Sequence, residues 1–212
     1  LAKSIYLYKV KKKSFIIPQL KIEDYAAEGK SIARLDGKVI FIEGGIPGDV
    51  VDVWVTKTKK DWAEGKVDKL IYPSKQRIDA FCQHFGICGG CKWQMLLYEQ
   101  QLIYKQKEVE DNLTRIGKIN IPAIQPIIGA AETQYYRNKL EYTFSEWRYK
   151  TRAELQQQQS LHANKEPGAL GFHVPKLFDK VVNIEACYLQ PFPSNDLRNA
   201  VRSFAHQHQL PF

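Results

Sequence analysis

The chain has 212 residues, of which 44% are hydrophobic and 25% are charged. These fractions are typical of a globular protein and argue against a disordered chain, and no apolar run approaches the roughly 20 residues of a membrane span. The formal net charge of +8 indicates an anionic partner, of which nucleic acid is the commonest kind.

The two ends of the chain are unusual. Leu1-Ala2-Lys3-Ser4 begins without a Met, and a lysine-rich segment follows where a secretory signal would be apolar. Leu210-Pro211-Phe212 ends the chain on an aromatic residue without a polar tail. We therefore expect a cytoplasmic protein without a membrane segment, and a fragment of a longer chain.

Residues 1–72 have the pattern of several short strands. In 51–55, three valines alternate with Asp52 and Trp54, which is the period of a half-buried strand. Short strands joined by Gly- and Pro-rich turns within about 70 residues predict a small β-barrel. The expected strands are 38–42, 51–55 and 62–71, the last with a break at Gly65, and the expected turn is 43–49.

Residues 73–212 mix helix and strand patterns. From Met95 to Ile116, apolar residues recur at helical spacing, and Gly117 is placed to end the helix. A polar excursion is expected over 148–167. A last helix carries Leu197, Val201 and Phe204, with Ser194, Asn195 or Asp196 as its cap. Three further strands are predicted over 140–144, 169–173 and 181–184, so the whole chain is α+β and mostly β.

The positive charge is concentrated in the first part of the chain. Residues 1–81 contain 16 Lys or Arg against 11 Asp or Glu, a net of +5, whereas residues 82–212 contain 15 against 12, a net of +3. Lysines beside an aromatic such as Trp62 suit phosphate neutralisation with base stacking. A solvated basic surface is an equally good interpretation. The clustered lysines are Lys11, Lys12, Lys13, Lys57, Lys59 and Lys60.

Three of the four cysteines occupy one short segment. Five residues separate Cys82 from Cys88, two separate Cys88 from Cys91, and 95 separate Cys91 from Cys187. Three close thiolates with a distant fourth are typical of a chain that wraps a metal centre. The glycines between them allow the backbone to turn tightly.

Three kinds of site compete for this pattern. Disulfides require an oxidising compartment, and no secretory signal is present. Structural zinc usually shows two tight Cys-x2-Cys pairs, whereas only Cys88 and Cys91 form one here. A four-iron four-sulfur cluster held by four thiolates fits best. His84 is an alternative ligand, although a place beside the centre suits it better.

Two consecutive motifs carry a family resemblance. They are Cys82-x5-Cys88-Gly89-Gly90-Cys91-x2-Gln94 and the following Tyr98-x2-Gln101-x3-Lys105. In residue types and spacing they resemble the RNA (uracil-5-)-methyltransferase family, which includes the iron–sulfur ribosomal RNA uridine methyltransferases.

Segments on both sides of these motifs agree with the resemblance. Residues 29–41 with Ile46-Pro47-Gly48-Asp49 look like a TRAM domain, an RNA-binding β-barrel. Three later segments resemble the family's central domain. They are Tyr136-Arg137-Asn138-Lys139-x-Glu141, Gly171-Phe172-His173 and Asn183-Ile184-x2-Cys187.

The resemblance implies a fold, a cofactor and a partner. It implies an OB-like TRAM barrel over 1–72, then a cluster loop, a long helix and a mixed α/β central domain over 73–212 that is incomplete at its C-terminal end. RNA, ribosomal in origin, would be held by both domains. Arg137 and Lys139 are the expected phosphate contacts of the central domain, unless Arg137 instead pairs with Glu141. The implied ligands of a 4Fe-4S cluster are Cys82, Cys88, Cys91 and Cys187.

The chemistry of the family lies outside this chain. In the family a cysteine adds to C6 of uridine, S-adenosylmethionine methylates C5 and a base removes the C5 proton, all in a C-terminal Rossmann-like domain. Here the cluster takes all four cysteines, and Gly44-Gly45-x2-Gly48 fits a hairpin turn rather than a cofactor site. We expect an S-adenosylmethionine-dependent methyltransferase as the full-length protein. This fragment is expected to be an inactive monomer without catalytic or S-adenosylmethionine-binding residues.

Two other hypotheses fit the same residues. One is a metal-stabilised RNA-binding module with no enzymatic purpose. The other is a redox sensor, in which an oxidatively labile cluster regulates RNA binding.

Overall fold

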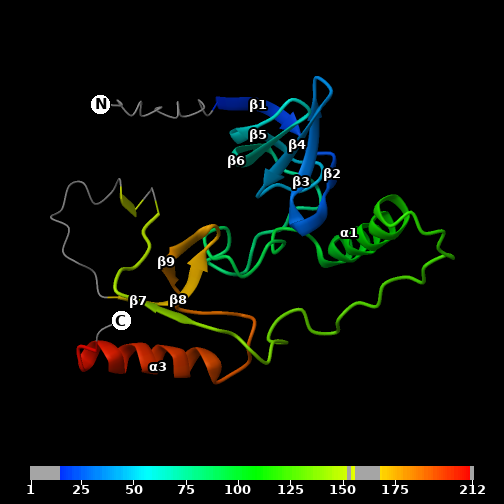
Figure 1. Cartoon of the computed structure of the whole chain (residues 1–212). Helices are drawn as coiled ribbons and strands as arrows, with labels where there is room; N and C mark the ends of the chain where they lie inside the picture. The colour runs from blue at the N-terminus through cyan, green and yellow to red at the C-terminus, as the bar shows by residue number, and fades with distance from the viewer. Residues whose placement is uncertain (1–14, 152–153, 156–167, 211–212) are drawn as a thin grey trace, which may run out of the picture. The chain divides into compact units, whose positions relative to one another are not determined.

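The computed structural model describes residues 15–151, 154–155 and 168–210 (Figure 1). Its contacts divide the chain into two compact units, Leu1–Arg77 and Ile78–Phe212. The lysines Lys11, Lys12 and Lys13 lie outside the described residues, as does most of the polar excursion predicted over 148–167. Within the described ranges, no helix has the length and apolar character needed to cross a membrane.

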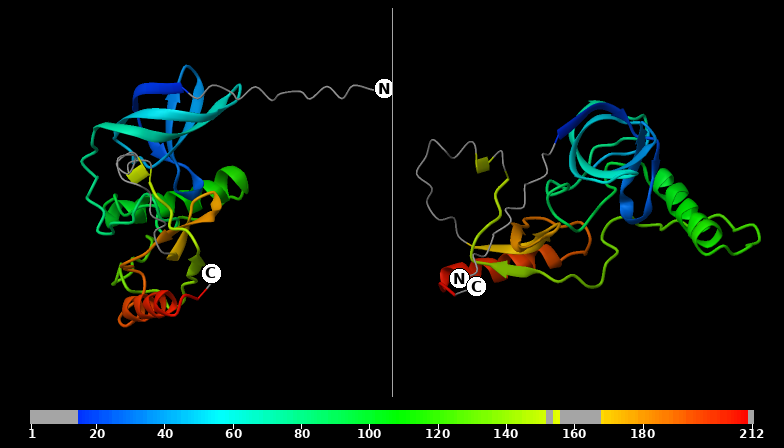
Figure 2. Two further views of the ribbon diagram at one scale, coloured as in Figure 1. Left: turned by 90° about the vertical axis from the view of Figure 1, so that its left-hand side faces the viewer. Right: turned by 45° about the horizontal axis from the view of Figure 1, so that its top comes forward.

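A six-stranded sheet forms the first unit. Its strand order is β1-β5-β6-β4-β3-β2; the β4–β6 pair is parallel and the other pairs are antiparallel. The sheet curls strongly in the second view of Figure 2. The elements are β1 (Phe15–Lys21), β2 (Asp24–Tyr25), the short helix η1 (Ala27–Gly29), β3 (Ser31–Leu35), β4 (Lys38–Glu43), β5 (Val50–Thr58) and β6 (Trp62–Tyr72).

The core of this sheet follows the predicted alternation. Val51, Val53 and Val55 of β5 are buried, whereas Asp52 and Trp54 between them face outward. The break expected at Gly65 is wrong, because β6 runs through this residue. A Cβ at Gly65 would lie 2.8 Å from the Trp54 carbonyl oxygen, so glycine permits a close approach of β6 to β5.

A buried ion pair fastens the end of the first unit. Asp49 is fully buried; its Oδ1 accepts the Ser74 backbone N–H at 2.8 Å, and its Oδ2 accepts the Ile46 backbone N–H at 2.9 Å. The Arg77 guanidinium lies 2.6 Å from Oδ2 and 3.1 Å from Oδ1. Arg77 therefore belongs to the first unit, just past the boundary expected at 72/73.

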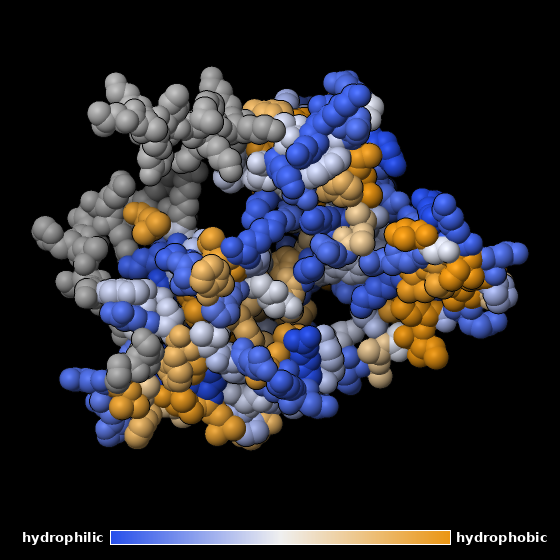
Figure 3. Space-filling view, viewed as in Figure 1, coloured by the Kyte–Doolittle hydropathy of each residue, from blue (hydrophilic) through white to orange (hydrophobic). Residues whose placement is uncertain are grey.

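The second unit begins with the cysteine-bearing loop and a helix. The helix α1 (Tyr98–Asp111) continues as a π-helical turn, η2 (Asn112–Ile116), and ends at Gly117 as predicted. It starts at Tyr98 rather than at Met95. Apolar side chains gather at the α1 end of this unit in the space-filling view (Figure 3), where Ile103, Val109 and Ile116 are exposed.

A three-stranded antiparallel sheet and a last helix complete the second unit. The sheet order is β7-β8-β9, with β7 (Thr143–Ser145), β8 (Ala169–Val174) and β9 (Leu177–Asn183). The strand expected over 140–144 is only partly right, because regular pairing begins at Thr143. Gly171 has no room for a Cβ, which would collide with the Val182 carbonyl oxygen of β9.

The last helix, α3 (Ser194–Gln207), differs from expectation in its cap. Ser194, Asn195 and Asp196 all lie inside the first turn, and Pro193 occupies the cap position. Arg198 and Ala205 are buried, whereas Leu197, Val201 and Phe204 are exposed. The side of α3 that packs on this unit is therefore the side that carries an arginine.

Candidate metal centre and adjacent basic cavity

The segment that carries three cysteines is a series of tight turns. The Phe85 backbone N–H donates to the Cys82 carbonyl at 3.0 Å, and the Cys88 N–H donates to the His84 carbonyl at 2.9 Å. Gly86 adopts a positive φ of 84°, a conformation that side chains disfavour. These turns bring the three thiols to one side of the loop.

Two glutamines of the family-like motif fix this loop. The Cys82 backbone N–H donates to the Gln94 side-chain oxygen at 3.2 Å. The Gln101 side-chain amide of α1 donates to the Trp93 and Leu96 carbonyls at 3.1 and 2.9 Å. The motif marked both glutamines, but their roles become visible only in the fold.

The fourth cysteine lies at the other side of the site, between β9 and α3. Cys187 is buried beside Ile184 in a small apolar cluster that also contacts Cys88. Its backbone N–H donates to the Asn195 side-chain oxygen at 2.8 Å, and the Asn195 amide donates to the Cys187 carbonyl at 3.0 Å. Asn195 thus anchors the cysteine, although its sequence position suggested a helix cap.

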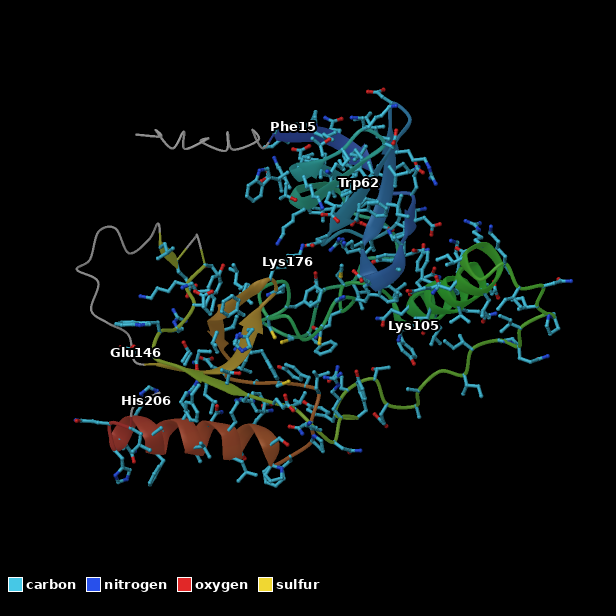
Figure 4. All side chains as sticks on the ribbon, viewed as in Figure 1. Phe15, Trp62, Lys105, Glu146, Lys176 and His206 are labelled. Atoms are coloured by element: carbon cyan, nitrogen blue, oxygen red, sulfur yellow. The ribbon has the colours of Figure 1, made fainter. Side chains whose placement is uncertain are left out.

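All four thiols line one small cavity. Figure 4 shows sulfur atoms, in yellow, close to β8, and the walls between them are largely apolar side chains, including Phe172, Ile184 and Leu189. The four cysteines are free thiols. Within the described residues, no three His, Cys, Asp or Glu side chains converge as the ligands of a single ion do. The cavity is lined by Cys82, Cys88, Cys91 and Cys187.

His84 lies beside the thiols and is engaged by the backbone. Its Nε2 accepts the Glu185 N–H at 3.2 Å, which joins the cysteine loop to the segment before Cys187. Burial lowers the pKa of His84, and the charge of Arg198 lowers it further against the opposing effect of Glu185. The interpretation of His84 as a neighbour rather than a ligand agrees with this geometry.

Burial and mutual repulsion disfavour the ionised form of the Cys82 and Cys88 thiols while no metal is bound. Burial raises the pKa of the Cys88 thiol to about 11, and the three other thiols add to the rise. The Gly90 backbone N–H opposes it by donating to the Cys88 sulfur at 3.3 Å. Burial likewise raises the pKa of Cys82. A bound cationic metal centre would remove this penalty, and four sulfur donors in an apolar setting suit a soft one.

A second and larger cavity lies next to the cysteine loop. It has a volume of about 450 Å³, within the range of small-ligand sites. Its lining joins the glycine pair of the loop to both predicted phosphate contacts of the central region. The lining residues are Gly89, Gly90, Arg137, Lys139, Leu140, Glu141, Phe172, His173 and Leu189.

The two basic residues of this cavity are held differently. The Arg137 backbone N–H donates to the Leu189 carbonyl at 2.8 Å, which fixes the main chain and leaves the side chain exposed. Glu141 lies 2.7 Å from the Lys139 ammonium, and both side chains are exposed. The alternative of an Arg137–Glu141 pair is wrong, because Glu141 takes the cation two residues away.

Three lysines of the first unit, Lys57, Lys59 and Lys60, lie at the β5–β6 hairpin. The Lys57 ammonium lies 4.8 Å from the centre of the Trp62 ring, a cation–π contact. Lys59 and Lys60 occupy the turn between the strands, where the Lys59 N–H donates to the Trp62 carbonyl at 2.8 Å. The hairpin therefore combines an aromatic ring with three exposed or partly exposed cations.

Comparisons with known proteins match both units. The TRAM domain family matches residues 19–67, within the curled sheet. An RNA methyltransferase of Bacteroides thetaiotaomicron is 51% identical over 187 residues, which is 88% of this chain and 40% of that protein. A 23S rRNA (uracil(1939)-C(5))-methyltransferase of Nitrosospira multiformis is 33% identical, over 90% of this chain and 40% of its own length.

The chain is similar to RNA methyltransferases over about nine tenths of its length. A solved tRNA (uracil-54, C5)-methyltransferase of Pyrococcus abyssi, in complex with S-adenosyl-L-homocysteine, has a similar fold. Its TM-score is 0.52 at 19% identity, over 90% of this chain and 37% of that one. The chain thus spans about two fifths of the length of the two RNA methyltransferases named above, at 40% of each.

Proposed function

We propose that this chain is the RNA-recognition and iron–sulfur part of an S-adenosylmethionine-dependent RNA uridine C5-methyltransferase that acts on ribosomal RNA. The observation that carries the proposal is that one loop, residues 82–91, lines both the cysteine cavity and the basic cavity. The thiols of Cys82, Cys88 and Cys91 face the cavity shared with Cys187, while Gly89 and Gly90 of the same loop line the basic cavity.

The four cysteines would hold a 4Fe-4S cluster. When bound, the cluster would tie the loop to the segment before α3, because its ligands come from both. Three features of the chain support this role: the apolar walls, the N–H donated by Gly90 to the Cys88 sulfur, and the free state of all four thiols. The loop backbone that lines the basic cavity would then be held rigid by the metal centre.

Arg137 and Lys139 would bind the RNA backbone. Guanidinium and ammonium groups are the common partners of phosphate, and the main chain at Arg137 is fixed by its hydrogen bond to Leu189. Lys139 forms an exposed ion pair with Glu141. Because such pairs stabilise a protein by only about 0–1 kcal/mol, Lys139 could leave Glu141 and bind an RNA phosphate with little loss of free energy. The β5–β6 hairpin would supply a second contact, with Trp62 beside the three lysines.

Methyl transfer would require the remainder of the protein. We assign the cysteine nucleophile, the base and S-adenosylmethionine binding to a C-terminal Rossmann-like domain, so this chain alone is expected to bind RNA without methylating it.

RNA binding at different salt concentrations tests the role of the basic cavity. Each phosphate contact to a single strand contributes about 0.7 to the slope of log affinity against log salt concentration. The double variant Arg137→Gln/Lys139→Gln should therefore lose about 1.4 from the magnitude of that slope for uridine-rich single-stranded RNA, measured by fluorescence anisotropy.

A charge-matched variant serves as the control. Arg115→Gln/Lys180→Gln removes two cations that pair with Asp111 and Asp179 elsewhere in the second unit, and its slope should equal that of the unaltered chain. Equal slopes for the two double variants would contradict the assignment of Arg137 and Lys139.

A further inference from the structure

Arg198 is a buried cation whose acceptors are uncharged. Only 4% of the residue is exposed. Nε donates to the Ile184 carbonyl at 3.1 Å and Nη2 donates to the Glu185 carbonyl at 2.7 Å. Its further acceptors within the described residues are the Asn195 and Asn199 side-chain oxygens and the Tyr142 hydroxyl.

Such an arrangement is unusual. A charge removed from water is costly unless an opposite charge compensates it. Among the described residues, no carboxylate accepts from Arg198, and the Glu185 side chain instead accepts from Gln83 at 3.3 Å. The neutral oxygens satisfy the hydrogen-bonding capacity of the guanidinium and leave its charge uncompensated.

The contacts of Arg198 all lead toward Cys187. Asn195, which accepts from Nη1 at 2.8 Å, holds both backbone groups of Cys187. The Ile184 and Glu185 carbonyls precede this cysteine in the chain. The guanidinium therefore fixes the whole segment that presents the fourth thiol.

Tyr142 completes a direct connection. Its hydroxyl oxygen accepts from Arg198 Nη1 at 3.4 Å, and the guanidinium carbon lies 5.2 Å from its ring centre. Burial raises the pKa of this hydroxyl, and the neighbouring Cys187 thiol raises it further. Because a hydroxyl has one hydrogen and its oxygen here receives the Arg198 N–H, the hydrogen is free to point at the sulfur.

We propose that Arg198 is the counter-charge of an anionic four-thiolate metal centre and that the Tyr142 hydroxyl delivers this charge to the Cys187 sulfur. Four thiolates exceed the charge of a divalent ion or of a 4Fe-4S core, so the occupied site is a net anion. Arg198 and Tyr142 are positioning residues in this arrangement, since both act through Cys187. The inference rests on the proposed metal centre.

Metal affinity provides the test, with Zn²⁺ as a probe that does not depend on cluster assembly. Tyr142→Phe keeps the ring and removes only the hydroxyl. Groups that hydrogen-bond to metal ligands typically contribute 10–100-fold to affinity. Tyr142→Phe and Arg198→Gln should each weaken Zn²⁺ binding by about tenfold or more in competition with a chromophoric chelator.

Arg202→Gln is the matched control. Arg202 lies on the same helix, and its Nη1 donates to the Asn183 side-chain oxygen at 2.6 Å rather than to the Cys187 segment. Its loss should leave Zn²⁺ affinity unchanged. In cluster-loaded protein, Tyr142→Phe should also make the reduction potential more negative, because a hydrogen bond to sulfur favours the reduced state.

The outcomes separate the inference from its premise. If the unaltered chain binds neither Zn²⁺ nor a cluster, the metal centre itself is refuted and the inference falls with it. If the unaltered chain binds metal and Tyr142→Phe binds equally well, the metal centre stands and the role of Tyr142 and Arg198 is refuted. Because Tyr142→Phe preserves packing, this comparison holds even if Arg198→Gln unfolds.

Discussion

At the scale of single residues, polar side chains outside the cysteines hold the candidate centre together, with Gln94 bound to Cys82 and Asn195 bound to Cys187. The spacing of the four cysteines predicted a shared site, and all four line one cavity. The contacts of Gln94 with Cys82, of Asn195 with Cys187 and of Arg198 with Ile184 could not be predicted. They join residues 8 to 14 positions apart, beyond the three- and four-residue spacings of a helix pattern. Asn195 was one of three candidates for the helix cap, and a local pattern does not reveal that the helix turns Arg198 inward.

Asp49 illustrates how a single residue stabilises the first unit. Its carboxylate accepts from two backbone N–H groups and from two atoms of Arg77, with no exposure to solvent. Asp49→Asn should lower the free energy of unfolding by about 3–5 kcal/mol, since it leaves the Arg77 charge unpaired. Urea unfolding followed by circular dichroism measures the loss.

The exposed Asp68 is the control for this substitution. Asp68→Asn should change the unfolding free energy by no more than about 0.5 kcal/mol, as is usual for surface positions. Equal effects of the two substitutions would show that the Asp49–Arg77 pair does not stabilise the fold.

At the scale of elements, period-2 alternation predicted strands well where one face is buried. β4, β5 and β6 agree with expectation to within a few residues because alternate side chains, isoleucine in β4, valine in β5 and alanine in β6, pack into one core. The strand over 140–144 was predicted too long, since alternation does not show whether a partner strand is available for pairing. Only Thr143–Ser145 pairs with β8.

The last helix gives a prediction about which of its sides is buried. Ala205 is 4% exposed whereas Val201, one turn earlier, is 51% exposed. Ala205→Asp should destabilise the chain by about 2 kcal/mol or more, because it buries a charge without a partner. Val201→Asp, with the same new side chain on the same helix, should cost well under 1 kcal/mol. Equal losses in urea unfolding would contradict the orientation of α3.

At the scale of the whole molecule, the family resemblance predicted more than the residue patterns could. Composition and charge suggested only a globular protein with an anionic partner. The comparisons add a TRAM domain over residues 19–67 and a similarity to RNA methyltransferases over most of the chain. The placement of Arg137 and Lys139 beside the cysteine loop required the fold, because 45 residues separate Cys91 from Arg137 in the sequence. That placement sets the candidate metal centre beside the proposed RNA site.

The most direct test of this account is the iron and acid-labile sulfide content of the chain, purified without oxygen from cells that assemble iron–sulfur clusters. We expect about four iron and four sulfide per chain. Both should fall sharply in Cys187→Ser, because the fourth ligand is removed. Stoichiometric zinc without iron, or an iron content unchanged by Cys187→Ser, would contradict the proposed cluster.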